Sequence, residues 1–207
     1  MNIYTKYPRT IHLPYSESVE DDDIVRNDDH FKGMNVVVTI KKDGENTSLY
    51  SNYTHARSID SVNHSSRDWV KKWWMERSYN LPNNMRVCGE NVFAKHSIAY
   101  KNLKHYFYGF SIWEDDICLS WEDTIEWFTL LEITPVIVIY EGVYDKEAIL
   151  KAFTPFINEH EGFVVRNAGS FEYKNFCNNV AKYVRKNHVQ SNKHWMHQAV
   201  IPNELEK

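Results

Sequence analysis

Five consecutive β-branched residues followed by a charged turn are the feature that most limits how this chain can fold. Residues 36–40 have the sequence Val-Val-Val-Thr-Ile, which is typical of a buried strand. Lys41 ends that run. Asp43 and Gly44 follow as a turn dipeptide, because glycine accepts a positive φ without a steric cost. A second strand-like stretch comes next, so residues 36–53 are predicted to form a β-hairpin.

The position of Lys41 at the mouth of this strand allows a chemical role. The turn is expected to bring Asp43 and Asn46 close to it. A lysine that is partly desolvated there, next to a phosphate ligand, can lose its proton and become a nucleophile. For this stretch alone, a hairpin with solvated lysines is the simpler interpretation, because short motifs recur by chance. The remainder of the chain has to decide between the two.

Composition restricts the class of protein. The chain has 207 residues, which suits one domain spanning residues 1–207, and its 43% hydrophobic content is enough for a packed core. A net charge of -4 provides no global basic field, so any nucleic-acid surface must be a local patch. The three cysteines lack C-x-x-C spacing, which argues against a zinc site and favours a reducing, cytoplasmic location. No signal peptide and no run of about 18 apolar residues is visible.

The pattern of short strands and modest helices predicts an α+β fold with antiparallel sheets and flanking helices. The acidic stretch 17–29 is predicted to be a solvated loop. Tryptophans at helical spacing are predicted to pack in a core, and the histidine-bearing tail, 187–207, to be a packed polar segment and not a metal site. Strands are expected at 85–93, 105–113, 135–140, 161–166 and 180–185, and helices at 67–79, 120–131 and 145–153.

Charged and aromatic residues stand where these elements break or turn. A lysine that attacks a phosphate needs carboxylates for a divalent metal, cations for the leaving phosphates and an aromatic face for a base. Each motif alone is weak, but their order is specific. In chain order they are Lys41 with Asp43 and Asn46, Arg57, Glu90 after Gly89, Phe110, Glu161 before Gly162, and Lys182 with Arg185.

This order resembles the covalent nucleotidyltransferase superfamily of ATP-dependent ligases and mRNA capping enzymes, and most closely the ATP-dependent RNA ligases. The resemblance covers about residues 7–196. It implies a ligase adenylation domain whose nucleotide cleft lies between antiparallel sheets. It also implies that Lys41 is the adenylated lysine, with Asn46 near the nucleotide and the 5′-phosphate. Arg57 and Glu90 match a nucleotide-binding arginine and the carboxylate that binds ribose.

The same resemblance assigns the remaining positions. Phe110 matches the aromatic residue that stacks on the nucleotide, and Glu161 matches the glutamate associated with Mg²⁺ or Mn²⁺. Lys182 and Arg185 fall where the family places its phosphate-binding cations. The attacking amine must be neutral although a free lysine has a pKa of about 10.4. Partial burial and the nearby cations are expected to favour that neutral form.

Three departures from the family pattern concern specificity. Ile40 precedes the lysine where glutamate is common, and Ser111 follows the stacking aromatic where aspartate is common. The last motif lacks Lys-x-Lys. Residues three apart on a strand point to opposite faces unless a bulge intervenes. Which of Lys182, Arg185 and Lys186 contacts the α-phosphate is therefore left open.

The resemblance implies an ATP-dependent RNA ligase that joins 5′-phosphate and 3′-hydroxyl ends of RNA. The expected form is minimal, with no OB-fold domain and only a short tail after the last motif. Two alternatives stay open. One is a DNA-end ligase or a capping-type nucleotidyltransferase, and the other is a non-catalytic nucleotide- or RNA-binding module of the same fold.

Overall fold

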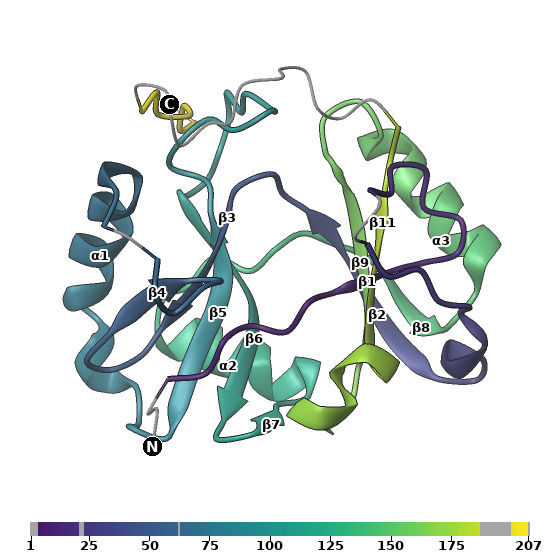
Figure 1. Ribbon diagram of the computed structural model, residues 1–207, viewed down its shortest axis with the longest axis horizontal. Helices are drawn as coiled ribbons and strands as arrows, with labels where there is room; N and C mark the ends of the chain where they lie inside the picture. Colours follow the sequence, from purple (N-terminus) through teal and green to yellow (C-terminus); the bar gives the residue numbers. More distant parts are fainter. Residues whose placement is uncertain (1–3, 21–22, 62, 187–199, 207) are drawn as a thin grey trace.

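A computed structural model describes residues 4–20, 23–61, 63–186 and 200–206. Two mostly antiparallel sheets face each other, and helices cover their outer faces (Figure 1). The first sheet has the order β1 (Ile11–His12), β11 (Val180–Val184), β9 (Gly162–Asn167), β2 (Asn35–Lys41), β8 (Val138–Val143). The second has the order β10 (Phe171–Glu172), β7 (Ile117–Cys118), β6 (Phe107–Glu114), β5 (Met85–Asn91), β3 (Glu45–Leu49), β4 (Thr54–Ala56). The helices are α1 (Asp68–Met75), α2 (Trp121–Leu130) and α3 (Lys146–Phe153).

The prediction of a hairpin at 36–53 is wrong, because the two strands belong to different sheets. This arrangement puts Lys41 next to the space between the sheets. β2 pairs with β8 and β9 in the first sheet, whereas β3 pairs with β4 and β5 in the second. The chain therefore crosses from one sheet to the other directly after Lys41. Gly44 does not have the positive φ that was predicted for it. A Cβ there would lie 2.6 Å from the carbonyl oxygen of Asn91, so the crossing requires glycine for close approach.

The two faces of β2 have different surroundings because strand side chains alternate. Val36, Val38 and Ile40 are almost fully buried in a core that includes Ile149 and Phe153 of α3. The alternate residues of β2 face the second sheet. The β-branched run thus fills a core with one half of its side chains and leaves the other half for the space between the sheets.

The second sheet packs its outer face on α1 and α2. Trp73 and Trp74 are buried with Val87 of β5, which confirms that the tryptophan stripe is core. Ser120 caps α2 by accepting a hydrogen bond from the Asp123 N–H at 3.1 Å, as its position before the helix predicts.

Two sequence predictions fail at the edges of the sheets. β8 is the edge strand of the first sheet, and none of its residues is fully buried, although residues 135–140 look like a buried strand. The acidic stretch 17–29 is not wholly solvated, because the Asp23 side chain is only 13% exposed and ion-paired. In the described part of the chain, no helix is long and apolar enough to span a bilayer.

The N-terminal end of the described chain joins the two sheets, and the C-terminal end packs on the connection between β5 and β6. The N-terminal segment, purple in Figure 1, runs from the second sheet, where the Thr5 N–H donates to Tyr50 Oη at 2.8 Å, to β1 in the first. Near the C-terminus, the buried Asn203 donates to the Val92 carbonyl at 2.8 Å and accepts from the Tyr100 N–H at 2.9 Å. Residues 200–206 are thus a packed tail, whereas 187–199 lie outside the described residues.

Candidate active site

A cavity of about 740 Å³ lies between the sheets. Its wall on the first sheet follows from strand register. Thr39, Val164, Lys182 and His12 are successive cross-strand partners on β2, β9, β11 and β1, so all four side chains project from the same face. All four line the cavity. Lys41 stands two residues beyond Thr39 and therefore shares this face.

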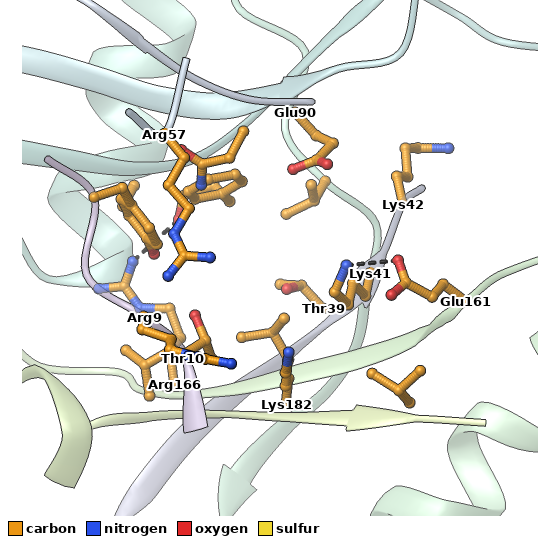
Figure 2. A pocket seen from close by; sticks show the side chains of 18 of the residues that line it. Arg9, Thr10, Thr39, Lys41, Lys42, Arg57, Glu90, Glu161, Arg166 and Lys182 are labelled. Atoms are coloured by element: carbon orange, nitrogen blue, oxygen red, sulfur yellow. Dashed lines mark hydrogen bonds and ion pairs between the residues drawn. The ribbon is translucent and has the colours of Figure 1, made fainter. Parts of the chain in front are cut away.

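Lys41 and Glu161 lie side by side on the wall formed by the first sheet and point toward each other, and Glu90 approaches from the second sheet (Figure 2). Lys41 Nζ donates a hydrogen bond to Glu161 Oε2 at 2.5 Å. Burial alone would lower the pKa of Lys41, but Glu161, Glu90 and Asp43 outweigh it and raise that pKa above its ordinary value. The expectation of a neutral amine is therefore wrong for the ligand-free site, because carboxylates are nearer to Lys41 than cations are.

Gly162 fixes the position of Glu161 beside Lys41. A Cβ on Gly162 would lie 1.9 Å from the Tyr183 carbonyl oxygen, so only glycine lets β9 and β11 pair here. The side chain of Glu161 is 12% exposed. The glutamate therefore enters the cavity from a rigid strand end.

The acidic groups around Lys41 are suited to a hard cation. Burial raises the pKa of Glu90 to about 8, with further increases from Glu161 and Asp43 and a decrease from Lys41. Asn46 Oδ1 is buried with no hydrogen-bond partner in the described structure. Mg²⁺ typically uses one or two carboxylates, with water and substrate phosphates completing the shell. These residues fit that pattern, and no cluster of three or more His, Cys, Asp or Glu ligands is preformed within the described residues.

Phe110 reaches the apolar end of the cavity through a β-bulge. Cys88 pairs with Ser111 and Gly89 pairs with Gly109, which leaves Phe110 without a partner on β5. The bulge turns its ring into the cavity. Tyr7 packs edge-on against that ring, with centroids 5.3 Å apart. Further apolar lining comes from Val136, Val164, Phe171 and Val180.

Arg166 connects the two sheets beneath Phe110. Its guanidinium donates to the carbonyl oxygens of Phe110 at 3.3 Å and Leu119 at 2.8 Å, and also to its neighbour Asn167 at 3.1 Å. The residue is 5% exposed. Arg166 therefore holds the bulge in place through the backbone.

The other predicted site residues divide into two groups. Arg57 and Lys182 line the cavity and project into it in Figure 2. Asp43, Arg185 and Lys186 are not part of its lining. Asp43 uses its carboxylate to accept from the Ile98 N–H at 2.7 Å. Arg185 comes directly after the end of β11 and donates to the His160 carbonyl at 2.8 Å.

Sequence reasoning missed several charged or polar residues of the cavity wall, including Arg166. Arg9, His12 and Asp23 come from the N-terminal segment, and Glu45 follows the crossing. Their roles depend on contacts between residues far apart in the chain, and no local pattern gives these.

Lys42 is buried next to Lys41 but points away from the Lys41–Glu161 pair (Figure 2). Its amine lies over the rings of Tyr100 and Tyr108, at 4.9 and 4.3 Å from the centroids. Burial lowers the pKa of Lys42 to about 8. The Lys42 amine has its ordinary pKa of 10.5 in the unfolded chain, which therefore binds the proton more tightly than the folded protein does. The contribution of Lys42 to the free energy of unfolding consequently rises between about pH 8 and pH 10.5.

Replacing Lys42 with methionine is therefore expected to stabilise the protein at pH 7 by about 1 kcal/mol, since methionine fills the space without a buried charge. The gain should shrink at pH 9.5, where wild-type Lys42 is neutral. Urea unfolding at both pH values measures this, with the exposed Lys72→Met as control. An equal gain at the two pH values would contradict the assignment.

Solved structures that resemble this fold include ligases. An archaeal ATP-dependent RNA ligase aligns with 88% of this chain and 48% of its own, at 14% identity and a TM-score of 0.57. A Naegleria gruberi RNA ligase variant solved with ATP and Mn covers 90% of this chain and 57% of its own, at 15% identity and a TM-score of 0.58. A protein assigned as an ATP-dependent DNA ligase from Aquifex aeolicus covers 87% and 50%, at 16% identity and a TM-score of 0.57.

The chain thus spans about half the length of these proteins, and the likeness establishes a ligase nucleotidyltransferase fold. No curated protein sequence matches the chain significantly. The family profile for RNA ligase matches residues 34–184, from the start of β2 to the end of β11. That match includes both Lys41 and Glu161 and covers well over half of the sequence, so this protein belongs to the RNA ligase family.

Proposed function

We propose that this protein is an ATP-dependent polynucleotide ligase that seals 5′-phosphate and 3′-hydroxyl ends of RNA. The observation that carries the proposal is the Lys41–Glu161 contact inside a cavity that also holds cations and an apolar, aromatic-lined end. A nucleoside triphosphate needs those three environments for its reacting phosphate, its other phosphates and its base. A binding module has no need of this partly buried lysine.

In the first step, the Lys41 amine attacks the α-phosphorus of ATP. The Lys41 ammonium first loses one proton to water; the neutral amine then forms the nitrogen–phosphorus bond while the bond to the pyrophosphate oxygen breaks, and a second proton passes from the nitrogen to water as pyrophosphate leaves. Lys182 and Arg57 neutralise charge on the phosphates, Phe110 stacks on adenine, and Glu90 binds ribose hydroxyls. A bound Mg²⁺ or Mn²⁺, held by Glu161, would act as a Lewis acid toward the phosphates.

Two further transfers complete the reaction. The AMP moves from lysyl-AMP to the 5′-phosphate of an RNA end, and the 3′-hydroxyl of a second end then displaces AMP. The name of the matching family supports RNA as the substrate. We also propose a reducing, cytoplasmic location, which the free thiols of Cys88, Cys118 and Cys177 support.

Incubation with α-labelled ATP and Mg²⁺ or Mn²⁺ tests the first step. Wild-type protein is expected to retain the label after denaturation, because a phosphoramidate is covalent. Lys41→Ala is expected to lose it, and peptide mass spectrometry should locate the AMP on Lys41. Lys72→Ala, at an exposed position on α1, serves as the matched control.

Ligation assays then separate the substrates. RNA and DNA strands are placed on each side of a nick, and single-stranded ends are compared with nicked duplex. Absence of a covalent adduct in the wild type, or an undiminished adduct in Lys41→Ala, rules out the enzymatic proposal. Adduct formation with sealing of DNA only would assign the protein to DNA ends.

A further inference from the structure

Asp23 occupies the centre of a cation cluster on the cavity wall. Its Oδ1 lies 3.2 Å from Arg9 Nη2 and 3.7 Å from Lys182 Nζ. Its Oδ2 lies 2.9 Å from His12 Nε2 and accepts from the Glu20 N–H at 3.1 Å. One carboxylate thus meets three basic side chains and a backbone donor. Two oxygens surrounded by such donors reproduce the surroundings of a bound phosphate.

His12 is arranged to donate toward this position. The residue is 1% exposed, and its pKa is lowered by burial and by Lys182, against the opposing effect of Asp23. Ser16 Oγ accepts from the Val184 N–H at 2.9 Å and lies 2.8 Å from His12 Nδ1. When the serine hydroxyl donates to Nδ1, and not to the Val184 carbonyl 3.4 Å away, the neutral ring carries its proton on Nε2. His12 Nε2 is buried with no well-aligned hydrogen-bond partner in the described structure although Asp23 Oδ2 lies 2.9 Å away, so it can donate to a better-aligned phosphate oxygen.

The cluster belongs to the same cavity as Lys41. His12 and Lys182 are register partners on β1 and β11, and both face the cavity together with Arg9 and Asp23. Lys41 and Arg57 both lower the pKa of Lys182, after burial itself, so these cations share one electrostatic environment. The Arg9 side chain is 37% exposed and the Asp23 side chain 13%, which places the cluster at a wall that a ligand can reach.

We propose that Arg9, His12 and Lys182 form a phosphate-binding subsite whose place Asp23 holds until substrate displaces it. The ligand is a phosphate group of a substrate, and its identity rests on the proposed function. It is either the outer phosphates of ATP, which leave as pyrophosphate, or the 5′-phosphate of a nucleic-acid end. In both cases the anion exchanges with the carboxylate, which turns away from the basic side chains.

Calorimetric titration with inorganic pyrophosphate tests the subsite without any need for catalysis. Asp23→Asn removes the competing charge and should tighten pyrophosphate binding about tenfold, whereas Arg9→Ala should weaken it about tenfold. Arg9→Lys should restore part of the loss. Asp29→Asn, an exposed acid outside the cluster, is the matched control and should leave binding unchanged. Arg9 is partly exposed, so its replacement tests the subsite even if Asp23→Asn proves unstable.

Two further measurements identify the source of the phosphate. If the subsite takes the outer phosphates of ATP, Arg9→Ala raises the ATP concentration needed for half-maximal labelling of Lys41. If it takes a 5′-phosphate, Arg9→Ala leaves labelling unchanged and removes the preference for 5′-phosphorylated over 5′-hydroxyl RNA. Weaker or unchanged pyrophosphate binding in a folded Asp23→Asn variant overturns the proposal. Failure of wild-type labelling would count against the ligase function and leave the titration result standing.

Discussion

Replacing Glu161 with glutamine is expected to reduce lysyl-AMP formation roughly 100- to 1000-fold, the effect of losing the carboxylate proposed to hold the metal ion beside the reacting phosphate. The same change should make Lys41 easier to deprotonate. Glu161 is the strongest of the groups that raise the pKa of Lys41, so its neutral replacement lets burial dominate. Catalysis and amine reactivity should therefore change in opposite directions, which a merely structural role for Glu161 would not produce.

Both quantities can be measured on the same samples. Labelling with α-labelled ATP gives the catalytic loss, and limited acetylation followed by peptide mass spectrometry gives the reactivity of Lys41. Glu159→Gln, an exposed neighbour, is the control for both. Lower acetylation of Lys41 in Glu161→Gln would show that the carboxylate does not hold the amine in its charged form.

Replacing Arg67 with alanine is expected to have the largest effect on stability. Arg67 and Glu45 form a two-pronged pair, with Nε 2.6 Å from Oε2 and a second contact from Nη2 to Oε1. Both side chains are almost buried, at 7% and 11% exposure. Breaking such a pair leaves an uncompensated buried carboxylate, which costs about 3–5 kcal/mol. The free energy of urea unfolding should fall by that amount.

The double replacement Glu45→Leu/Arg67→Met supplies the decisive comparison. Removing both charges should recover most of the loss, because the penalty comes from the orphaned carboxylate. Lys32→Ala, which breaks an exposed pair with Asp29, should leave stability unchanged. If Arg67→Ala costs no more than this surface control, the pair does not anchor the start of α1 to β3.

The sequence predicted the strands and helices well but not their partners. Residues 36–40 form a buried strand as expected, yet the strand that follows belongs to the other sheet. Propensity and alternation are local properties, whereas pairing depends on the whole sheet. The spacing of Lys182 and Arg185 indicated that both side chains need not face the cavity, and of the two only Lys182 lines it.

The electrostatics of the site could not be predicted in the same way. Lys41 was expected to be surrounded by cations, but the contacts that determine its pKa come from Glu161 and Glu90 on two different strands. Asp23 was expected in solvent because it lies in an acidic stretch. Its actual partners are up to 159 positions away, at Lys182. The sequence gives the sign of each charge, but the distances between charges depend on how the strands are arranged in the fold.

The crossing after Lys41 has a mechanical consequence. The Lys41 amine is attached to the last residue of β2, and the chain enters the other sheet only four residues later, at Glu45. The N-terminal segment forms a second connection between the sheets. A change in the distance between the two sheets must therefore move the Lys41 nitrogen as well, so the width of the cavity and the position of that nitrogen change together.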